Sequence, residues 1–497
     1  MKLNPLSAID FYKANHVKFY GPETESLYEN FCPRSTKHLE KVDGTDDKIV
    51  AFGLQYPIKY FLIELWNTEF FNKPKEEVIR KYKRRMDNAL GKDAVQTDHL
   101  EALHDLGYLP LIIKALPEGS VINAKVPYFT IKETDKRFAW LVGYLEDALS
   151  CLTWKASTSA TIARKYKQIG INAANATGVD PGFVDFAFHD FSLRGMSGFQ
   201  DACMSGSGHL LSFYGSDNVP SIDFMEDYYN ANSDVEMIGC GVAANEHSVV
   251  CSGLKENEFT NYKKWINETF PTGIVSLVSD TWNLWTVITE FLPLLKEDIV
   301  NRDGKVVLRP DSSPKTPLEI ICGDPDAEIG SPEYKGVVEL LYEIIGGFEN
   351  GSGYKELDPH IGMLYGEAIS LSLAPKIFTR LKEKGFASNT CFLGIGSMTY
   401  ALRTRDTLGY ALKATQCVVD GETREIFKDP VTDGNTGFKK SAKGLLRVDF
   451  IDGEYVMKDQ CTPEEEHGGE LKTVFLNGEL LIDWSLSEIR ERVAKSF

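Results

Sequence analysis

Apolar and polar positions follow several different patterns along this chain of 497 residues. In residues 1–72 short apolar runs alternate with polar turns. In residues 109–130 Pro and Gly separate apolar runs that are typical of strands. Residues 73–91 carry charged side chains at helical spacing and predict a solvent-exposed surface helix. Residues 138–178 also predict helices, because side chains such as Leu149 and Leu152 recur three or four positions apart.

From about residue 180 a different unit recurs. A short apolar run ends in a polar or charged group and is followed by a helical stretch; the runs cover residues 183–191, 241–248, 273–280, 306–313, 361–367 and 391–397. Continuous apolar strands that alternate with helices predict a parallel sheet buried on both faces. Polar groups at the ends of many such strands are the arrangement found at the active sites of α/β barrels. The spacing between units varies, so we expect an irregular (β/α) barrel and not a solenoid.

The length of the chain and its remaining segments predict two domains. A single core rarely grows beyond ~250–300 residues. Residues 321–360 are interpreted as a surface connection with one helix between loops rich in Gly and Pro, whereas the C-terminal residues return to hairpin-like strands with a turn at Asp452 and Gly453. We expect residues 180–404 to form the α/β barrel that carries the active site, and residues 1–179 and 405–497 to form a second α/β domain together.

The composition narrows the range of partners and compartments. With 54 basic and 72 acidic residues the net charge is −18, which disfavours nucleic acids and anionic membranes as partners. The N-terminus has no apolar signal-peptide core, and no run of ~20 apolar residues is present to span a membrane. The nine cysteines are scattered and form no C-x-x-C pair, so we expect neither a zinc site nor a disulfide framework, and a reducing cytoplasmic compartment.

Groups that can carry chemistry gather at the predicted strand ends. Each of them alone is usually structural, and their recurrence at one face raises the odds of a site. Arginines there fit phosphate, and carboxylates fit ribose hydroxyls or Mg²⁺. The set comprises His189, Asp190, Arg194, Glu246, His247, Asp280, Arg309, Asp311 and Glu367.

A short glycine-containing turn and a basic segment add two candidates for phosphate binding. Residues 394–397 (GIGS) lie between a predicted strand and a predicted helix, where backbone N–H groups bind phosphate, although a simple tight turn is at least as consistent with the pattern. No G-x-G-x-x-G or G-x-x-x-x-G-K-[ST] motif is present, which excludes Rossmann and P-loop sites. Seven cations follow downstream, of which the last two are better explained as a solvated face: Arg403, Arg405, Lys413, Lys428, Lys439, Lys440 and Lys443.

Nine motifs occur in an order that resembles a known family. They are DFYKANHVKFY (10–20), FGLQY (52–56), LPEG (116–119), HDFSLRG (189–195), GSD (215–217), AANEHS (243–248), SLVSD (276–280), LRPDS (308–312) and FKDP (427–430). Together they resemble the nicotinamide phosphoribosyltransferases of the type II phosphoribosyltransferase family, over essentially the whole chain. The resemblance implies an irregular α/β barrel with a second α/β domain, and homodimers with active sites shared between subunits.

The resemblance also implies an activity. Such an enzyme transfers the 5-phosphoribosyl group from 5-phosphoribosyl-1-pyrophosphate (PRPP) to nicotinamide, giving nicotinamide mononucleotide and pyrophosphate in NAD salvage. In this family ATP hydrolysis is coupled to synthesis through a phosphohistidine. Mg²⁺ is bound mainly through the diphosphate, and no protein ligand is assigned to it.

The same resemblance assigns the base-binding residues. Phe191 and Tyr12 of the partner subunit would stack on the two faces of the nicotinamide ring. Asp217 would accept a hydrogen bond from the carboxamide NH₂, and Ser276 would serve its carbonyl. An alternative for Asp217 is that it only caps the helix that starts near Pro220.

Further residues are assigned to the ribose and the diphosphate. Arg194 and Arg309 would hold the ring region and the diphosphate, and Asp311 the ribose hydroxyls. Gly366 and Glu367 stand where the family has Gly-Asp-Gly, so the longer carboxylate is expected to reach the ribose or a metal-bound water.

Phosphate binding and ATP coupling complete the implied site. The residues expected to bind phosphate are Gly396 and Ser397 for the 5′-phosphate, Arg405 and Lys413 from the partner subunit, and Arg34 and Lys428 for pyrophosphate. Ser397 and Met398 replace glycines of the family loop. His247 is expected to be phosphorylated by ATP, flanked by Glu246 and Asp280.

Two other functions stay open from the sequence. A nicotinate or quinolinate phosphoribosyltransferase on the same barrel would need a cationic or neutral group to recognise an anionic substrate, and Asp217 argues against both. A catalytically silent ligand-binding homologue is disfavoured by the complete set of strand-end residues.

Overall fold

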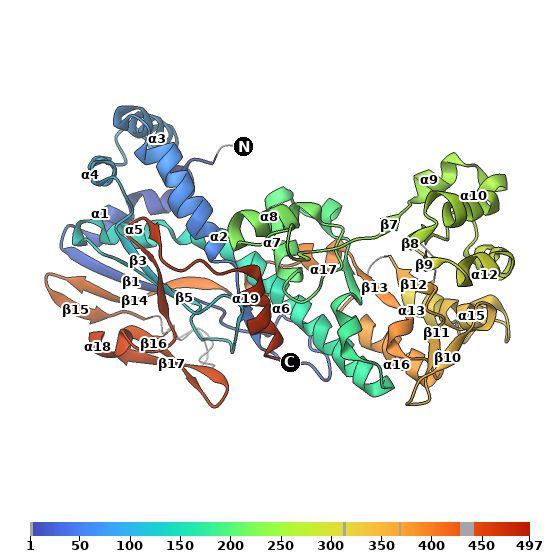
Figure 1. The fold of residues 1–497 in the computed structure, drawn as a ribbon. Helices are drawn as coiled ribbons and strands as arrows, with labels where there is room; N and C mark the ends of the chain where they lie inside the picture. The colour runs from blue at the N-terminus through green and yellow to red at the C-terminus, as the bar shows by residue number, and fades with distance from the viewer. Residues whose placement is uncertain (1–2, 312–314, 367–368, 428–441) are drawn as a thin grey trace.

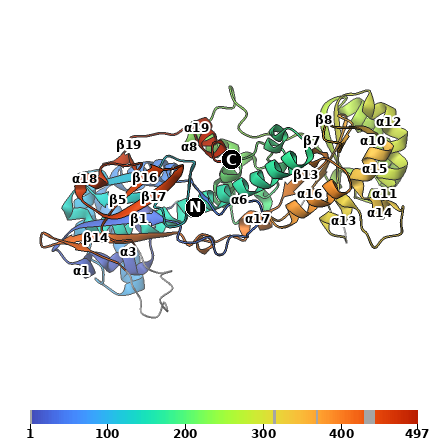
Figure 2. The same cartoon turned by 90° about the horizontal axis from the view of Figure 1, so that it is seen from below.

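The protein consists of two lobes joined by one long helix (Figure 1). The computed structural model describes residues 3–311, 315–366, 369–427 and 442–497. Helix α6 (Glu146–Thr177) runs between the lobes in both views (Figures 1 and 2). Among the described residues, no helix is both long and apolar enough to cross a membrane.

The first lobe is built on an antiparallel sheet that combines strands from both ends of the chain. Its order is β15 (Glu422–Glu425), β14 (Ala411–Val419), β1 (Thr24–Cys32), β5 (Phe129–Glu133), β3 (Leu111–Ala115), β18 (Lys472–Leu476) and β19 (Glu479–Leu480). The central pair β1–β14 joins Tyr28 to Gln416, so the N- and C-terminal segments share one core. Helix α5 (Ala139–Tyr144) packs on this sheet, and α3 (Lys75–Leu90) confirms the helix predicted for the charged segment.

Two short pairs of strands complete this lobe. Strand β2 (Ile49–Ala51) pairs with β4 (Ser120–Ile122). Strands β16 (Leu445–Ile451) and β17 (Glu454–Cys461) form a hairpin. Its turn at Asp452 and Gly453 is confirmed, and both residues have positive φ angles of 51° and 83°, as the twist of a tight hairpin requires.

The second lobe contains the predicted parallel sheet. Its order is β6 (Phe188–Asp190), β13 (Phe392–Ile395), β12 (Ile361–Tyr365), β9 (Asp303–Arg309), β8 (Thr272–Val278) and β7 (Ala243–Ala244). Each of the six apolar runs overlaps one of these strands, and every pair is parallel. Parallel bridges from Asp190 to Ser216 and from Gly215 to Cys240 continue beyond β6, so the sheet curls.

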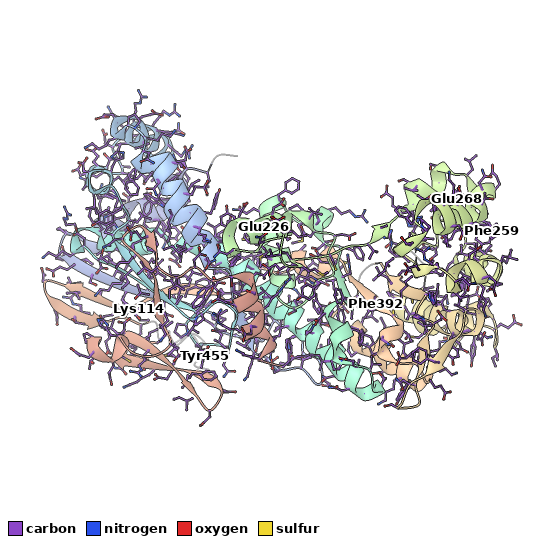
Figure 3. The ribbon with its side chains drawn as sticks, in the orientation of Figure 1. Lys114, Glu226, Phe259, Glu268, Phe392 and Tyr455 are labelled. Carbon is purple, nitrogen blue, oxygen red and sulfur yellow. The ribbon has the colours of Figure 1, made fainter. Side chains whose placement is uncertain are left out.

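Helices follow most of these strands and cover the sheet. They are α7 (Phe199–His209), α8 (Val219–Tyr229), α9 (His247–Ser252), α10 (Glu258–Lys264), α12 (Leu292–Val300), α13 (Pro317–Cys322), α15 (Val337–Ile344), α16 (Leu373–Glu383) and α17 (Ser397–Ala401). Side chains fill the space around the sheets in both lobes; Figure 3 labels Phe392 on the parallel sheet and Lys114 and Tyr455 in the antiparallel lobe.

The prediction of a single helix in residues 321–360 is wrong. This segment contains α14 (Pro332–Lys335) and α15, followed by a hairpin of β10 (Gly347–Glu349) and β11 (Lys355–Leu357). The two strands have three residues each and carry Glu349, Lys355 and Glu356. Strands this short and polar have no apolar alternation to reveal them.

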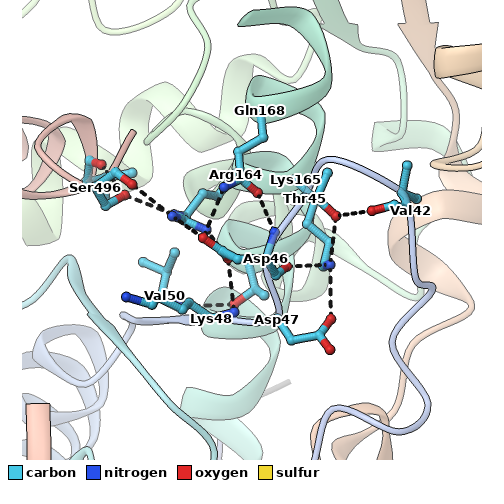
Figure 4. A network of polar contacts seen from close by, with 12 residues as sticks. Val42, Thr45, Asp46, Asp47, Lys48, Val50, Arg164, Lys165, Gln168 and Ser496 are labelled. Atoms are coloured by element: carbon cyan, nitrogen blue, oxygen red, sulfur yellow. Dashed lines mark hydrogen bonds and ion pairs between the residues drawn. The ribbon is translucent and has the colours of Figure 1, made fainter. Parts of the chain in front are cut away.

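Helix α6 is held by buried polar contacts as well as by apolar packing (Figure 4). The Arg164 guanidinium binds both oxygens of Asp46, at 2.6 and 2.9 Å, and donates to the Ser496 hydroxyl at 2.9 Å. Lys165 donates to the carbonyl of Asp46 at 2.6 Å. These contacts fix the loop around residue 46 and the C-terminus to a helix of 32 residues, about 48 Å long at 1.5 Å per residue.

Two of the sequence motifs meet at one buried carboxylate. Glu118 of the LPEG motif accepts hydrogen bonds from the backbone N–H groups of Gly53 (2.7 Å), Leu54 (2.9 Å) and Gln55 (2.7 Å). These residues belong to the FGLQY motif and precede or begin α2 (Gln55–Pro57). Both motifs therefore shape the interior of the first lobe.

Candidate active site

A cavity of about 510 Å³ lies at the parallel sheet and collects many of the predicted residues. Three alternate residues of β9 line it, namely Lys305, Val307 and Arg309, because alternate side chains of a strand point to the same face. Its other walls include His189, Phe191, Asp217 and Ser276. Apolar side chains make up most of the lining, and its polar and charged members are few.

One corner of the cavity combines a hydrogen-bond acceptor, a hydroxyl and an aromatic ring. The Asp217 carboxylate lies 2.8 Å from Nε2 of His189, and the His189 ring lies 4.6 Å from the ring of Phe191. The Ser276 hydroxyl is buried and has no hydrogen-bond partner among the described residues. A buried hydroxyl is costly to leave unpaired, which marks this corner as a place for a polar ligand group.

The capping role of Asp217 is not supported by the geometry. Helix α8 starts at Val219, its N-cap residue is Asn218, and no side chain makes a capping hydrogen bond there. The backbone N–H of Asp217 donates to the carbonyl of Asp190 at 2.9 Å instead. The carboxylate is left at the cavity, beside His189.

A second group forms around His247 at the ends of β7, β8 and β9. Nε2 of His247 lies 3.8 Å from Asp280 and 3.8 Å from Asp311, and its Nδ1 lies 3.0 Å from the Thr281 hydroxyl. The backbone N–H of Asp311 donates to the Asp280 carboxylate at 2.7 Å, which ties the backbone after β9 to the end of β8. Glu246 is exposed, and its carboxylate accepts from the Ser248 hydroxyl, so Asp311 takes the flanking position expected of Glu246.

Arg309 and Gly366 contact other members of this group or their neighbours. Arg309 donates to the carbonyl of Asn245, whose own side-chain oxygen accepts from the N–H of Val278 at 2.7 Å. A Cβ atom at Gly366 would lie 2.2 Å from the Asp311 carboxylate. Glycine at this position therefore leaves room for the Asp311 side chain.

The predicted phosphate turn lies beside Phe191, one of the residues that line the cavity. Gly396 is the N-cap of α17 and Ser397 its first residue. The N–H of Phe191 donates to the carbonyl of Ile395 at 2.9 Å, which ties the end of β6 to this turn. Arg194 is exposed on the neighbouring turn η7 (Leu193–Gly195), where a Cβ at Gly195 would collide with Ser397 at 2.2 Å.

Tyr12 and Lys413 belong to the other lobe. Tyr12 is 57% exposed on η2 (Phe11–Asn15), and Lys413 lies on β14. Glu146 at the start of α6 accepts from the ammonium groups of both Lys13 and Lys413, the latter at 3.4 Å. In Figure 1 the α1 and β14 region and strands β7–β9 are at opposite ends of the molecule, so one chain does not bring Tyr12 to its own cavity.

The remaining predicted residues have contacts of their own or lie outside the described part. The Arg34 side chain donates to the carbonyl of Gly409 at 2.6 Å, and Arg405 forms an ion pair of 3.4 Å with Asp406 on η12 (Arg405–Thr407). Glu367 and Lys428 lie outside the described residues. The sequence offers no reason to select Thr281 and Asn245, because Thr and Asn at the end of a strand do not by themselves indicate a functional site.

The chain resembles a set of known proteins. Residues 186–479 match the profile of the nicotinate phosphoribosyltransferase (NAPRTase) family. A protein of Acinetobacter baylyi named nicotinamide phosphoribosyltransferase is 51% identical over 99% of this chain and 98% of its own length. One of the same name from Xanthomonas campestris is 30% identical over 98% of this chain and 97% of its own. The crystal structure of human nicotinic acid phosphoribosyltransferase has the same fold, with a TM-score of 0.52 at 16% identity, over 98% of this chain and 93% of that chain.

Proposed function

The chain belongs to the nicotinate phosphoribosyltransferase family, and from this premise we propose that it transfers the 5-phosphoribosyl group of PRPP to nicotinamide. The products are nicotinamide mononucleotide and pyrophosphate, as a step of NAD salvage in the cytoplasm. The curled parallel sheet is then the irregular α/β barrel of the type II phosphoribosyltransferases, and the antiparallel lobe is its second domain.

The observation that carries the choice of nicotinamide is the corner formed by Asp217, Ser276 and Phe191. A carboxamide donates through its NH₂ and accepts through its carbonyl, and the corner offers a carboxylate acceptor and an unpaired hydroxyl donor. A flat ring between them fits against Phe191, because offset aromatic stacking adds ~0.5–1.5 kcal/mol.

The reaction needs alignment and charge neutralisation more than covalent help. The pyridine nitrogen attacks the anomeric carbon while pyrophosphate leaves, and positioning alone contributes ~7–11 kcal/mol in well-aligned reactions. Arg309 presents a permanent positive charge at the strand ends, where the diphosphate departs. Asp311 would accept hydrogen bonds from the ribose hydroxyls.

The residues present fit Mg²⁺ held through the substrate. Mg²⁺ keeps several waters and binds substrate phosphates, so the diphosphate oxygens would hold the ion, and the carboxylates of Asp280 and Asp311 would lie near it or bind its waters. When bound, Mg²⁺ neutralises the leaving diphosphate.

His247 is the residue through which ATP would act. Its ring is oriented by the Thr281 hydroxyl at Nδ1 and faces Asp280 and Asp311 through Nε2. Transfer of the γ-phosphoryl group of ATP to the ring releases ADP, and hydrolysis of the phosphohistidine returns the free ring. A phosphoryl group there adds negative charge beside the diphosphate site, which favours synthesis over the reverse reaction.

A homodimer would complete the site. Tyr12 lies far from the cavity of its own chain, and two other aromatic side chains of the same segment are exposed: Phe11 by 50% and Phe19 by 85%. Exposed apolar side chains of this size mark interaction surfaces. We therefore assign the second face of the nicotinamide ring to Tyr12 of the partner subunit, with Arg405 and Lys413 of the partner subunit near the phosphates.

A competition experiment tests the proposed substrate. The purified protein is given PRPP, Mg²⁺ and equal concentrations of nicotinamide, nicotinate and quinolinate, and the nucleotide products are separated and identified by mass. We expect nicotinamide mononucleotide to dominate. Formation of nicotinate mononucleotide as the main product would favour the nicotinate phosphoribosyltransferase alternative.

A further inference from the structure

A buried pair of side chains joins the phosphate turn to the base-recognition turn. Tyr400 of α17 and His209 at the end of α7 are both fully buried, and the Tyr400 hydroxyl lies 2.8 Å from Nδ1 of His209. Nε2 of His209 lies 3.0 Å from the carbonyl oxygen of Gly215. Tyr400 is three residues after Ser397, and Gly215 is two residues before Asp217.

The direction of these hydrogen bonds follows from their chemistry. Burial lowers the pKa of His209, so its imidazole is neutral, and burial raises the pKa of Tyr400, so its hydroxyl keeps the proton. The carbonyl of Gly215 only accepts, so Nε2 of His209 carries the proton and donates it. Nδ1 is then an acceptor, and the Tyr400 hydroxyl donates to it.

Both ends of this chain of hydrogen bonds are fixed by further contacts. Lys155 of α6 is buried and donates to the backbone carbonyl of Tyr400 at 2.7 Å. The carbonyl of Gly215 also accepts from the N–H of Asp190 at 3.1 Å, so both of its lone pairs are occupied. The turn at Gly215 is tightly packed, because a Cβ at this position would lie 2.8 Å from Nδ1 of His189.

We propose that Tyr400 and His209 are positioning residues that set the spacing between the 5′-phosphate subsite and the base subsite. The inference rests on the proposed function, since it assigns the phosphate to residues 396–397 and the amide to Asp217. The ring nitrogen must meet the anomeric carbon of a ribose whose phosphate is anchored at α17. A misplacement of about 1 Å between reacting groups costs about a hundredfold in rate.

Tyr400→Phe tests this role, because it removes one hydroxyl and keeps the ring. It leaves Nδ1 of His209 buried without a donor, so the Gly215 turn is released from α17. We expect kcat/KM for nicotinamide to fall at least tenfold. The matched control is Tyr28→Phe, which removes another buried hydroxyl, one that accepts from the N–H of Leu446 in the antiparallel lobe. Tyr28→Phe is expected to change kcat/KM less than twofold, although it lowers Tm by about as much as Tyr400→Phe does.

A double-mutant cycle separates positioning from general destabilisation. If Tyr400 acts through the base-recognition turn, Tyr400→Phe has little further effect on kcat/KM for nicotinamide once Asp217→Ser has removed the amide contact. Two results would overturn the proposal. One is a double variant whose loss of kcat/KM equals the product of the two single losses, and the other is a Tyr28→Phe variant that loses as much activity as Tyr400→Phe. If Tyr400→Phe does not fold, the same cycle is run with His209→Gln, which moves the acceptor away from the hydroxyl. If the wild-type protein makes no nicotinamide mononucleotide, the proposed function fails before this test begins.

Discussion

Replacing Asp217 with serine tests how the protein distinguishes an amide from an acid. The change removes the negative charge at the cavity and the acceptor for the carboxamide NH₂, and His189 loses its partner at 2.8 Å. We expect nicotinamide to be used less well and nicotinate better. Since Asp217 makes no capping hydrogen bond with α8, the melting temperature is expected to change little.

The size of the effect follows from the exposure of the carboxylate. Two unit charges ~4 Å apart repel by about 1 kcal/mol in bulk water and about 4 kcal/mol at an effective dielectric constant of 20. The side chain of Asp217 is 52% exposed, so about 2 kcal/mol is appropriate for the repulsion between Asp217 and nicotinate. The lost hydrogen bond adds about 1 kcal/mol. Together they amount to about a hundredfold preference for nicotinamide, since ~1.4 kcal/mol is tenfold.

The assay is kcat/KM for nicotinamide and for nicotinate on the wild type and on Asp217→Ser. Asp223→Ser serves as the control, because it removes an equally negative, exposed side chain of α8 that does not line the cavity. We expect the ratio of the two constants to drop by about a hundredfold in Asp217→Ser and to stay unchanged in Asp223→Ser. An unchanged ratio in Asp217→Ser would refute the reasoning.

Three further predictions concern coupling, assembly and pH. His247→Ala should abolish ATP hydrolysis and the ATP-driven gain in synthesis; an alanine variant that hydrolyses ATP at the wild-type rate would exclude the phosphohistidine. Inactive Arg405→Ala and Arg309→Ala chains, mixed, should regain activity in heterodimers because one of the two shared sites is then intact, and heterodimers that form without activity would argue against sharing. Burial raises the pKa of Glu29 to about 7, so the folded chain keeps a proton that the unfolded chain releases near pH 4.5, and stability falls as the pH rises through this window. Glu29→Gln should therefore be more stable than the wild type at pH 8, by up to about 3 kcal/mol in denaturant titrations, and gain nothing at pH 4; an equal gain at both pH values would contradict this.

The parallel sheet could be predicted because its strands are short, mostly apolar runs that alternate with helices. Runs such as residues 273–280 and 391–397 are mostly apolar, and their polar ends identify the edge of the sheet where His247, Asp280 and Arg309 meet. The antiparallel sheet was harder to predict in detail. Its pairing of β1 with β14 joins residues almost 400 positions apart, and nothing in the local pattern specifies such a partner.

The positioning residues could not be predicted, because they are polar residues inside helices. Lys155 and Arg164 on α6 carry charges, and His209 and Tyr400 carry polar groups, all features typical of surfaces. The structure buries all four because each finds a fixed hydrogen-bond partner in another element. Such partners depend on the tertiary arrangement.

The central claim is tested most directly by the rate at which the purified protein converts nicotinamide and PRPP, with Mg²⁺, to nicotinamide mononucleotide and pyrophosphate. We predict that the two products form in equal amounts, that ATP increases the yield, and that Arg309→Ala lowers kcat/KM by at least a hundredfold. Absence of nicotinamide mononucleotide from the wild-type reaction, or a wild-type kcat/KM that is higher for nicotinate than for nicotinamide, would contradict the account.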